Sequence, residues 1–498
     1  MSHVFRLGER VAPVVLTGMT VALLMAAGRC VGLENEKGQA GVARRTSLTL
    51  TLSQRERGIP ALRQPVAQRE RETAALSEAL SQKDGSHDET LRKQILANFF
   101  VPQPLPALNA HSHRRFKPAP GVTAEAVTYA TQFGMRVPAI LYLPDPPPRT
   151  DSGKIPGFIV VNGHGGDKYS WYSFYTGILY ARAGAAVLTY DQAGEGERNA
   201  DRKSGTRAHD RIQGDAAMAR RLAGLMITDA MQAVSYLSRR PEVDPKRIGA
   251  AGYSLGSFVL SLAGAVETRL YACVLVGGGN LDGPDGYWDN SKPMCQGFPY
   301  RSLAFLGDRG AAIYALHASR GPTLLWNGLA DTVVAMERTG EPFFRDLYQR
   351  TVKLRGSAKG VFETGFDPQG SHRPYFLARP VALWLEKQLD FPNWTEASIR
   401  SMPETVIGRW AAQYNIPMDR LYASEDREGG LRALGAGVPG YAREDLSVFS
   451  LADWQRQKKQ MVLETWLEAA GGQTHGPAGR QPKASTMGTI RSRASSTT

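Results

Sequence analysis

Between about residues 120 and 390, short apolar segments alternate with segments of helical length, and this alternation constrains the fold more than any other feature. The runs at 157–161 (GFIVV) and 185–190 (AAVLTY) are typical of strands buried on both faces. Residues 171–183 between them have helical length, and Gly184 is a natural helix stop. Strand, helix and strand in repetition predict a parallel sheet with helices on both faces.

The same patterns predict the remaining elements. Residues 122–129 and 135–143 indicate an opening antiparallel pair, and 222–239 and 375–389 indicate helices. Further strands are expected at 247–251, 271–276 and 323–326. Ligands of such sheets bind beyond the carboxyl ends of the strands, so the chemistry is expected there.

The two ends of the chain differ from this middle part. Residues 1–28 are predicted to be a signal peptide, with positive Arg6 and Arg10, an apolar run and cleavage after Gly28. An uncleaved membrane anchor is the alternative, since the run nearly reaches the ~20 residues that span a bilayer. Residues 29–85 are predicted to be a linker or pro-region, and 471–498 a disordered tail.

The charge also belongs mainly to the ends. The chain of 498 residues has a formal charge of +13, of which residues 1–85 and 471–498 contribute +4 each. A nucleic-acid-binding fold would gather its charge on one face of the folded part, so we expect no nucleic-acid partner. Export would place Cys273 and Cys295 in an oxidising compartment, and whether they pair stays open.

A candidate nucleophile stands in the sequence Gly252-Tyr253-Ser254-Leu255-Gly256, which matches G-x-S-x-G. The motif follows an apolar strand and precedes an apolar segment of helical length, which is the context it requires. A sharp turn there holds the serine in a strained conformation at a helix N-terminus, where the helix dipole favours developing negative charge. We therefore predict that Ser254 is the nucleophile.

The serine needs a base that is itself oriented by a carboxylate. Of the two histidines that lie late enough, His475 falls in the predicted tail, which leaves His372 in a loop before a helix. Asp331 follows the strand at 323–326 and a turn, and is the predicted acid. Asp367, just before His372, is its rival.

An oxyanion intermediate needs two donors. The backbone N–H of Leu255 is the first, and Gly166, in the glycine-rich turn after the strand at 157–161, is the predicted second. His164 in the same turn and Asp191 after the next strand are expected to stabilise loops rather than to react. The His111 and His113 pair has no spaced third ligand, so no metal and no organic cofactor are predicted.

Two further segments are candidates for the walls of a substrate site. The long connection 278–309 is expected to form one wall of an acyl pocket. The aromatic cluster within 169–175 either lines a cleft or packs a helix against the sheet. Residues 391–470 are predicted to form a small helical appendage, either a lid or an element docked on the far face.

These residues resemble the α/β-hydrolase superfamily, and more narrowly its acetyl xylan esterase and dienelactone-hydrolase-like branch. The resemblance covers roughly 90–395 and rests on the motifs GHGGDK, YDQAGEGER, EVDPKRIGAAGYSLGS, NGLADTVV and SHRPYF. It implies an α/β fold, a catalytic domain over 86–390 and hydrolysis of carboxylic esters through an acyl-enzyme on Ser254. Dienelactone hydrolases proper use a cysteine there, which argues against that activity.

The predicted function is therefore an exported serine esterase, periplasmic or extracellular, that acts on short-acyl and especially acetyl esters, including those of carbohydrates. A serine peptidase of the prolyl-oligopeptidase type shares the fold and the order of the triad. That class carries a propeller domain, for which residues 1–85 are too few and too polar. The remaining alternative is a non-catalytic binding scaffold, against which the complete set of site residues argues.

Overall fold

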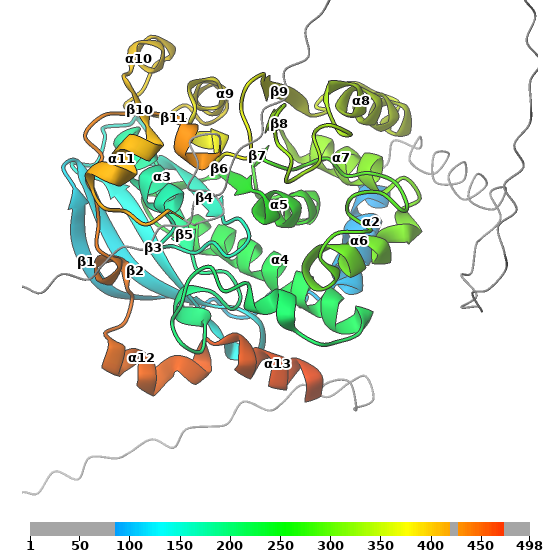
Figure 1. Ribbon diagram of the computed structural model, residues 1–498, viewed down its shortest axis with the longest axis horizontal. Helices are drawn as coiled ribbons and strands as arrows, with labels where there is room; N and C mark the ends of the chain where they lie inside the picture. The colour runs from blue at the N-terminus through cyan, green and yellow to red at the C-terminus, as the bar shows by residue number, and fades with distance from the viewer. Residues whose placement is uncertain (1–84, 419–426, 473–498) are drawn as a thin grey trace, which may run out of the picture. The chain divides into compact units, whose positions relative to one another are not determined.

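The computed structural model describes residues 85–418 and 427–472 (Figure 1). A nine-stranded sheet runs through the molecule in the order β1-β2-β3-β5-β4-β6-β7-β8-β9. The strands β1 to β3 and β5 pair antiparallel, and β5, β4, β6, β7, β8 and β9 pair parallel. The sheet strands are β1 His111–Ala119, β2 Val122–Ala130, β3 Arg136–Pro144, β4 Ile155–Val161, β5 Ala186–Tyr190, β6 Val243–Tyr253, β7 Ala272–Val276, β8 Thr323–Gly328 and β9 Glu363–Asp367.

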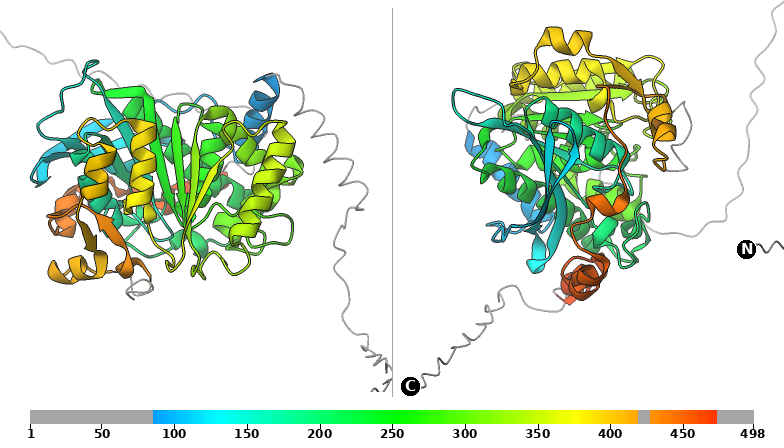
Figure 2. Two further views of the ribbon diagram at one scale, coloured as in Figure 1. Left: turned by 90° about the horizontal axis from the view of Figure 1, so that it is seen from above. Right: turned by 90° about the vertical axis from the view of Figure 1, so that its left-hand side faces the viewer.

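Helices cover both faces of this sheet (Figures 1 and 2). One buried apolar cluster joins one face to α2, α4, α5, α7 and α8, and a second joins the other face to α3 and α9. The helices are α2 Gly85–Asn98, α3 Trp171–Arg182, α4 Ala216–Ser238, α5 Leu255–Val266, α6 Phe298–Arg301, α7 Arg309–Arg320, α8 Glu341–Arg355, α9 Arg379–Leu389, α10 Glu396–Ser401, α11 Ile407–Gln413, α12 Leu451–Gln457 and α13 Leu463–Gly472.

The predicted α/β class and parallel sheet are confirmed. The strand β4 is buried along its whole length, as its continuous apolar run predicts. The helix predicted at 375–389 is shorter than expected, because residues 375–377 form a single 3-10 turn. The α-helix begins only at Arg379, with Pro380 in its first turn, where its missing N–H costs no hydrogen bond.

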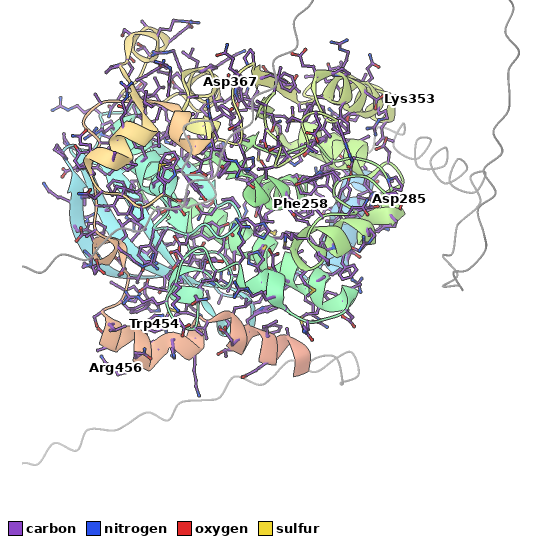
Figure 3. All side chains as sticks on the ribbon, viewed as in Figure 1. Phe258, Asp285, Lys353, Asp367, Trp454 and Arg456 are labelled. Carbon is purple, nitrogen blue, oxygen red and sulfur yellow. The ribbon has the colours of Figure 1, made fainter. Side chains whose placement is uncertain are left out.

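The segment that follows α9 is not purely helical, unlike the appendage that we predicted. Its strands β10 Glu404–Val406 and β11 Arg432–Leu434 form a separate two-stranded sheet. The apolar side chains of this segment up to residue 462 join the cluster that contains α3 and α9, and those of α13 join the other cluster, so the segment packs onto the body. Trp454 on α12, labelled in Figure 3, donates its indole N–H to the carbonyl of Glu197 at 2.9 Å.

The predicted signal peptide, linker and tail lie outside the described residues. Within 85–418 and 427–472, no helix is both long and apolar enough to cross a membrane. The boundaries of the predicted domains at 86–390 and 391–470 stay predictions.

Candidate active site

Ser254 occupies the sharp turn between β6 and α5. Its backbone has φ 55° and ψ −116°, a conformation that costs free energy for a residue with a side chain. A Cβ on Gly252 would lie 2.3 Å from the carbonyl oxygen of Gly256, and one on Gly256 would lie 2.0 Å from that of Val161. Only glycine fits at these two positions, so the motif is what permits the turn.

The predicted base and acid meet at the carboxyl ends of the strands. His372 Nδ1 lies 2.6 Å from Asp331 Oδ2, and both side chains are about 1% exposed or less. The other carboxylate oxygen of Asp331 accepts the backbone N–H groups of Val333 and Val334 at 2.8 and 3.3 Å. These bonds fix the carboxylate, which in turn orients the imidazole ring.

The rival acid does not take this place. Asp367 ends β9 (labelled in Figure 3), and its carboxylate lies 3.7 Å from the Arg373 guanidinium. Its second oxygen accepts the backbone N–H of Gln369 at 3.2 Å. Of the two aspartates, Asp331 is the one that is hydrogen-bonded to His372.

The ring of His372 packs beside the turn that holds Ser254. It lies 4.9 Å, between ring centres, from Tyr253, the residue directly before the serine. The Tyr253 hydroxyl oxygen lies 3.2 Å from the backbone carbonyl oxygen of His372. A Cβ on Gly277, at the end of β7, would lie 2.9 Å from His372 Cε1. The three sequence-predicted residues therefore come together at one edge of the sheet.

The two predicted oxyanion donors differ in whether their N–H groups already have a hydrogen-bond acceptor. Leu255 is the first residue of α5, so its N–H has no acceptor within the helix. The N–H of Gly166 donates to the carbonyl of Gly163 at 2.9 Å and closes a turn. This bond engages the Gly166 amide within its own turn, and the oxyanion role of Gly166 stays a prediction. Among the hydrogen bonds of the described residues, none uses the N–H of His164, which lines the same cavity as Ser254.

A buried ionic cluster holds the loop that contains these amides. Lys168 Nζ lies 2.6 Å from Asp191 Oδ2 and 2.9 Å from Glu197 Oε2, and all three side chains are fully buried. Asp191 also accepts the backbone N–H groups of Lys168 and Glu197 at 3.2 and 2.9 Å. Asp191 thus stabilises the loop in the structure, as expected. Sequence analysis did not identify Lys168 and Glu197 as its partners.

A cavity of about 530 Å³ opens at Ser254. The connection between β7 and α7 forms most of its wall, in agreement with the wall expected from residues 278–309. The lining of this cavity combines polar and apolar surface and includes His164, Arg207, Tyr287, Trp288, Asn290, Ser291, Lys292, Pro293, Gln296, Val333 and Val334.

A second cavity of about 450 Å³ lies on the other side of His164. Tyr169, Trp171 and Tyr172 line it, whereas Phe174 and Tyr175 are completely buried, so both interpretations of the aromatic cluster apply to parts of it. The segment after α9 supplies the facing wall, which includes Ile416, Pro417, Met418, Glu428, Tyr441 and Arg443.

Glu428 connects this segment to the turn at Ser254 and was missed from the sequence. Its carboxylate accepts the indole N–H of Trp171 at 2.5 Å and the hydroxyl of Tyr253 at 2.7 Å. No local motif marks Glu428, because the residues it contacts are 257 and 175 positions away in the chain.

The structure also places the histidine pair, His111 and His113, and the two cysteines, Cys273 and Cys295. His111 and His113 lie on β1, and His113 Nε2 is 2.9 Å from Thr128 Oγ1 rather than beside a third metal-binding side chain. Cys273 and Cys295 are both buried and do not pair with each other.

Comparisons with known proteins agree with the fold. The acetyl xylan esterase (AXE1) family profile matches residues 107–276, and the prolyl oligopeptidase family profile matches residues 215–373. The Bacillus subtilis (strain 168) protein YtaP is 31% identical over 91 residues, which are 18% of this chain and 29% of YtaP. The chain thus aligns with less than a third of that relative's length.

Solved structures are similar at low sequence identity. Methylesterase BT1017 is 19% identical with a TM-score of 0.51, over 83% of this chain and 81% of that one. An acetyl xylan esterase from Paenibacillus sp. R4 is 16% identical with a TM-score of 0.42, over 66% and 100% of the two chains. The sheet order, the turn at Ser254 and the likeness to BT1017 show the α/β-hydrolase fold, and each of the two family profiles matches less than half of the chain.

Proposed function

We propose that this chain is a serine hydrolase of carboxylic esters, with Ser254 as nucleophile, His372 as general base and Asp331 as the carboxylate that orients it. The observation that supports this most strongly is the 2.6 Å contact between His372 Nδ1 and Asp331 Oδ2 beside the strained turn at Ser254. This is the arrangement in which a serine hydroxyl is activated at neutral pH.

The reaction follows from these positions. The Ser254 hydroxyl attacks the ester carbonyl while its proton passes to Nε2 of His372, and the carboxylate of Asp331 stabilises the resulting imidazolium. The imidazolium then returns the proton to the leaving alkoxide, which departs as the alcohol. Water attacks the acyl-enzyme in a second, equivalent step and releases the acid.

The oxyanion requires two donors, and we assign them to the backbone N–H groups of Leu255 and His164. Leu255 is the first residue of α5, where the helix dipole adds to the attraction. We assign the second donor to His164 instead of the predicted Gly166, because no hydrogen bond among the described residues uses the His164 amide and because His164 lines the cavity at Ser254.

The cavity favours small esters of polar alcohols, including acetylated carbohydrates. Asn290, Ser291 and Gln296 offer hydrogen bonds to sugar hydroxyls, and Tyr287 offers a flat face beside them. The name of BT1017 refers to methyl esters and that of the Paenibacillus protein to acetyl esters. These names define the two ester types to compare, acetylated sugars and methyl esters of sugar acids.

The test is hydrolysis of p-nitrophenyl acetate by the purified wild-type chain beside Ser254→Ala. We expect the variant to lose activity by about 10⁴- to 10⁶-fold, because the acyl-enzyme no longer forms. Ser261→Ala is the matched control, since Ser261 lies on the same helix and its hydroxyl donates only to the carbonyl of Phe258. Equal activity in wild type and Ser254→Ala would refute the assignment.

The second candidate is a serine peptidase, which the match to the prolyl oligopeptidase family over residues 215–373 favours. That segment contains all three residues of the proposed triad. A proline-containing peptide anilide, assayed beside the ester at equal concentration, separates the two activities. We expect cleavage of the ester and little or none of the anilide, and a preference for the anilide would reverse the proposal.

We also propose that the chain is exported, on the basis of its first 28 residues. Expression of the full chain followed by N-terminal sequencing of the product tests this. Cleavage after Gly28 is the expected result, and a membrane-bound product that retains residues 1–28 would favour the anchor instead.

A further inference from the structure

Four side chains with metal-binding atoms gather beside the cavity at Ser254. They are His164, His209, Asp210 and Cys295, and their potential ligand atoms all lie within 4.8 Å of one another. His164 Nε2 is 2.9 Å from Asp210 Oδ2, and Cys295 Sγ is 3.2 Å from Asp210 Oδ1. The rings of His164 and His209 stack in parallel with centres 5.0 Å apart.

The types and spacing of these atoms fit a tetrahedral ion. Zn²⁺ in proteins takes four ligands from thiolate, imidazole and carboxylate groups. Ligand atoms at about 2.1 Å from such an ion lie about 3.4 Å from each other. The distances between Cys295 Sγ and His164 Nε2, 3.7 Å, and between His209 Nε2 and Asp210 Oδ1, 4.0 Å, need only small side-chain movements to reach this value.

An unsatisfied nitrogen provides an independent indication of a ligand. His209 is completely buried, and its Nε2 has no hydrogen-bond partner among the described residues. The Nδ1 atom lies 3.3 Å from the carbonyl of Ala193, an acceptor, so Nδ1 is the protonated nitrogen and Nε2 carries the lone pair. Metal-binding histidines are usually oriented by such a bond from their second nitrogen.

We propose that His164, His209, Asp210 and Cys295 form a binding site for Zn²⁺. Binding displaces the proton of the Cys295 thiol to solvent, and the thiolate and carboxylate together balance the charge of the ion. The buried imidazole of His209, whose Nε2 has no hydrogen-bond partner among the described residues, then gains one.

The site joins three separate segments next to the catalytic residues. His164 belongs to the loop after β4, His209 and Asp210 to the 3-10 turn at 208–211, and Cys295 to the π-helical turn at 293–297. The last two flank the cavity at Ser254 through Arg207 and Pro293. The ion therefore acts as a structural link that holds the backbone of His164 in place. Sequence spacing could not reveal the site, because its ligands are spread over more than 130 positions.

The site can be tested with metal alone, without any ester. The full chain is stripped with a chelator and titrated with Zn²⁺, followed by elemental analysis and by the shift in thermal unfolding. We expect one Zn²⁺ per chain and a higher unfolding temperature. Co²⁺ in place of Zn²⁺ should give the intense absorption of a thiolate bound to tetrahedral cobalt.

Two variants identify the ligands. Cys295→Ser should lose the thiolate absorption and bind Zn²⁺ at least about tenfold more weakly, the least that a perturbed ligand shell costs. His209→Gln should weaken binding similarly while keeping the thiolate absorption. Cys273→Ser is the matched control, because Cys273 is an equally buried free thiol elsewhere, on β7, and should leave both readouts unchanged.

The proposal is overturned if the stripped chain takes up no stoichiometric Zn²⁺, or if Cys295→Ser and wild type give the same cobalt spectrum. It does not depend on the proposed hydrolysis. The same titration on Ser254→Ala should give the same Zn²⁺ content, so the failure of the esterase and the failure of the metal site are separate results.

Discussion

Two buried carboxylates at the same edge of the sheet have almost the same hydrogen-bond pattern and different partners. Asp331, after β8, accepts two backbone N–H groups on Oδ1 and faces the imidazole of His372 on Oδ2. Asp191, after β5, accepts the N–H of Lys168 on Oδ1, and on Oδ2 that of Glu197 and the Lys168 ammonium. Each carboxylate is fixed by main-chain donors and then binds one basic side chain.

The difference lies in whether the basic partner can exchange its proton. An imidazole changes protonation near neutral pH, so the pair with Asp331 suits proton transfer. Burial alone would lower the pKa of Lys168, but the carboxylates of Asp191 and Glu197 reverse this and raise it. The ammonium therefore keeps its charge, and the cluster suits holding the loop that contains His164. The same strand-end geometry supports chemistry on one side of the cavity and rigidity on the other.

The largest expected effect is that of Asp331→Asn on turnover. An amide accepts the imidazole N–H less firmly than a carboxylate does, and it cannot stabilise the imidazolium. We therefore expect kcat to fall by about 10⁴-fold. Thermal unfolding of the variant checks that it is folded, and p-nitrophenyl acetate hydrolysis measures the loss.

Asp367→Asn is the control for that loss, since Asp367 is close in sequence to His372 but contacts Arg373 instead. We expect it to retain activity within a few-fold of wild type. Comparable losses of activity in the two variants would mean that Asp331 is not the one aspartate that orients His372.

The sequence could predict those site residues that a local motif or the order along the chain defines. It could not predict those that contacts between distant segments define. Ser254 follows from a five-residue motif and its flanking strand and helix, and Asp331 and His372 from their order along the chain. Gly166 was chosen from the glycine pattern of its turn, whereas the choice among adjacent amides depends on which of them closes the turn. Glu428 and the four proposed zinc ligands were missed because they are defined by contacts between distant segments.

The next largest expected effect is a loss of stability when the buried ammonium of Lys168 is removed. Lys168→Met leaves the buried carboxylate of Asp191 without its cation and removes one of the cations at Glu197, which should cost about 3–5 kcal/mol of the free energy of unfolding. Denaturant unfolding measures this difference.

Lys203→Met is the matched change at the surface, because Lys203 is 69% exposed and lies 3.5 Å from Asp201. An exposed pair of this kind contributes about 0–1 kcal/mol. If Lys168→Met were as mild as Lys203→Met, the cluster would not be what holds the loop.

Glu428→Gln tests whether the segment after α9 supports the chemistry. The change keeps the volume but removes the charge that strengthens the bonds from Trp171 and Tyr253, each worth about 1.5–3 kcal/mol. We expect a loss of stability within that range and a several-fold decrease in kcat/KM, because Tyr253 packs on His372. Glu444→Gln, at an exposed position of the same segment, should change neither quantity. Unchanged kcat/KM in Glu428→Gln would make the contact purely structural.

The smallest effect comes from a buried histidine that has no carboxylate partner. His317 Nδ1 lies 3.0 Å from Thr323 Oγ1 and Nε2 lies 2.8 Å from the carbonyl of Ser261, and burial lowers its pKa to about 3. Because the folded pKa lies below the unfolded value of about 6.5, the unfolded state binds an extra proton as the pH falls. The stability is therefore complete above about pH 6.5 and is lost toward pH 3, by up to about 1.4 kcal/mol per pH unit.

His317→Gln tests this, because glutamine offers neutral groups to the same partners. In a plot of unfolding free energy against pH, the slope between about pH 6 and pH 4 should decrease by that amount in the variant. Above about pH 7 the slopes of variant and wild type should be the same. Equal slopes in variant and wild type would mean that His317 is protonated in the folded chain as readily as in the unfolded one.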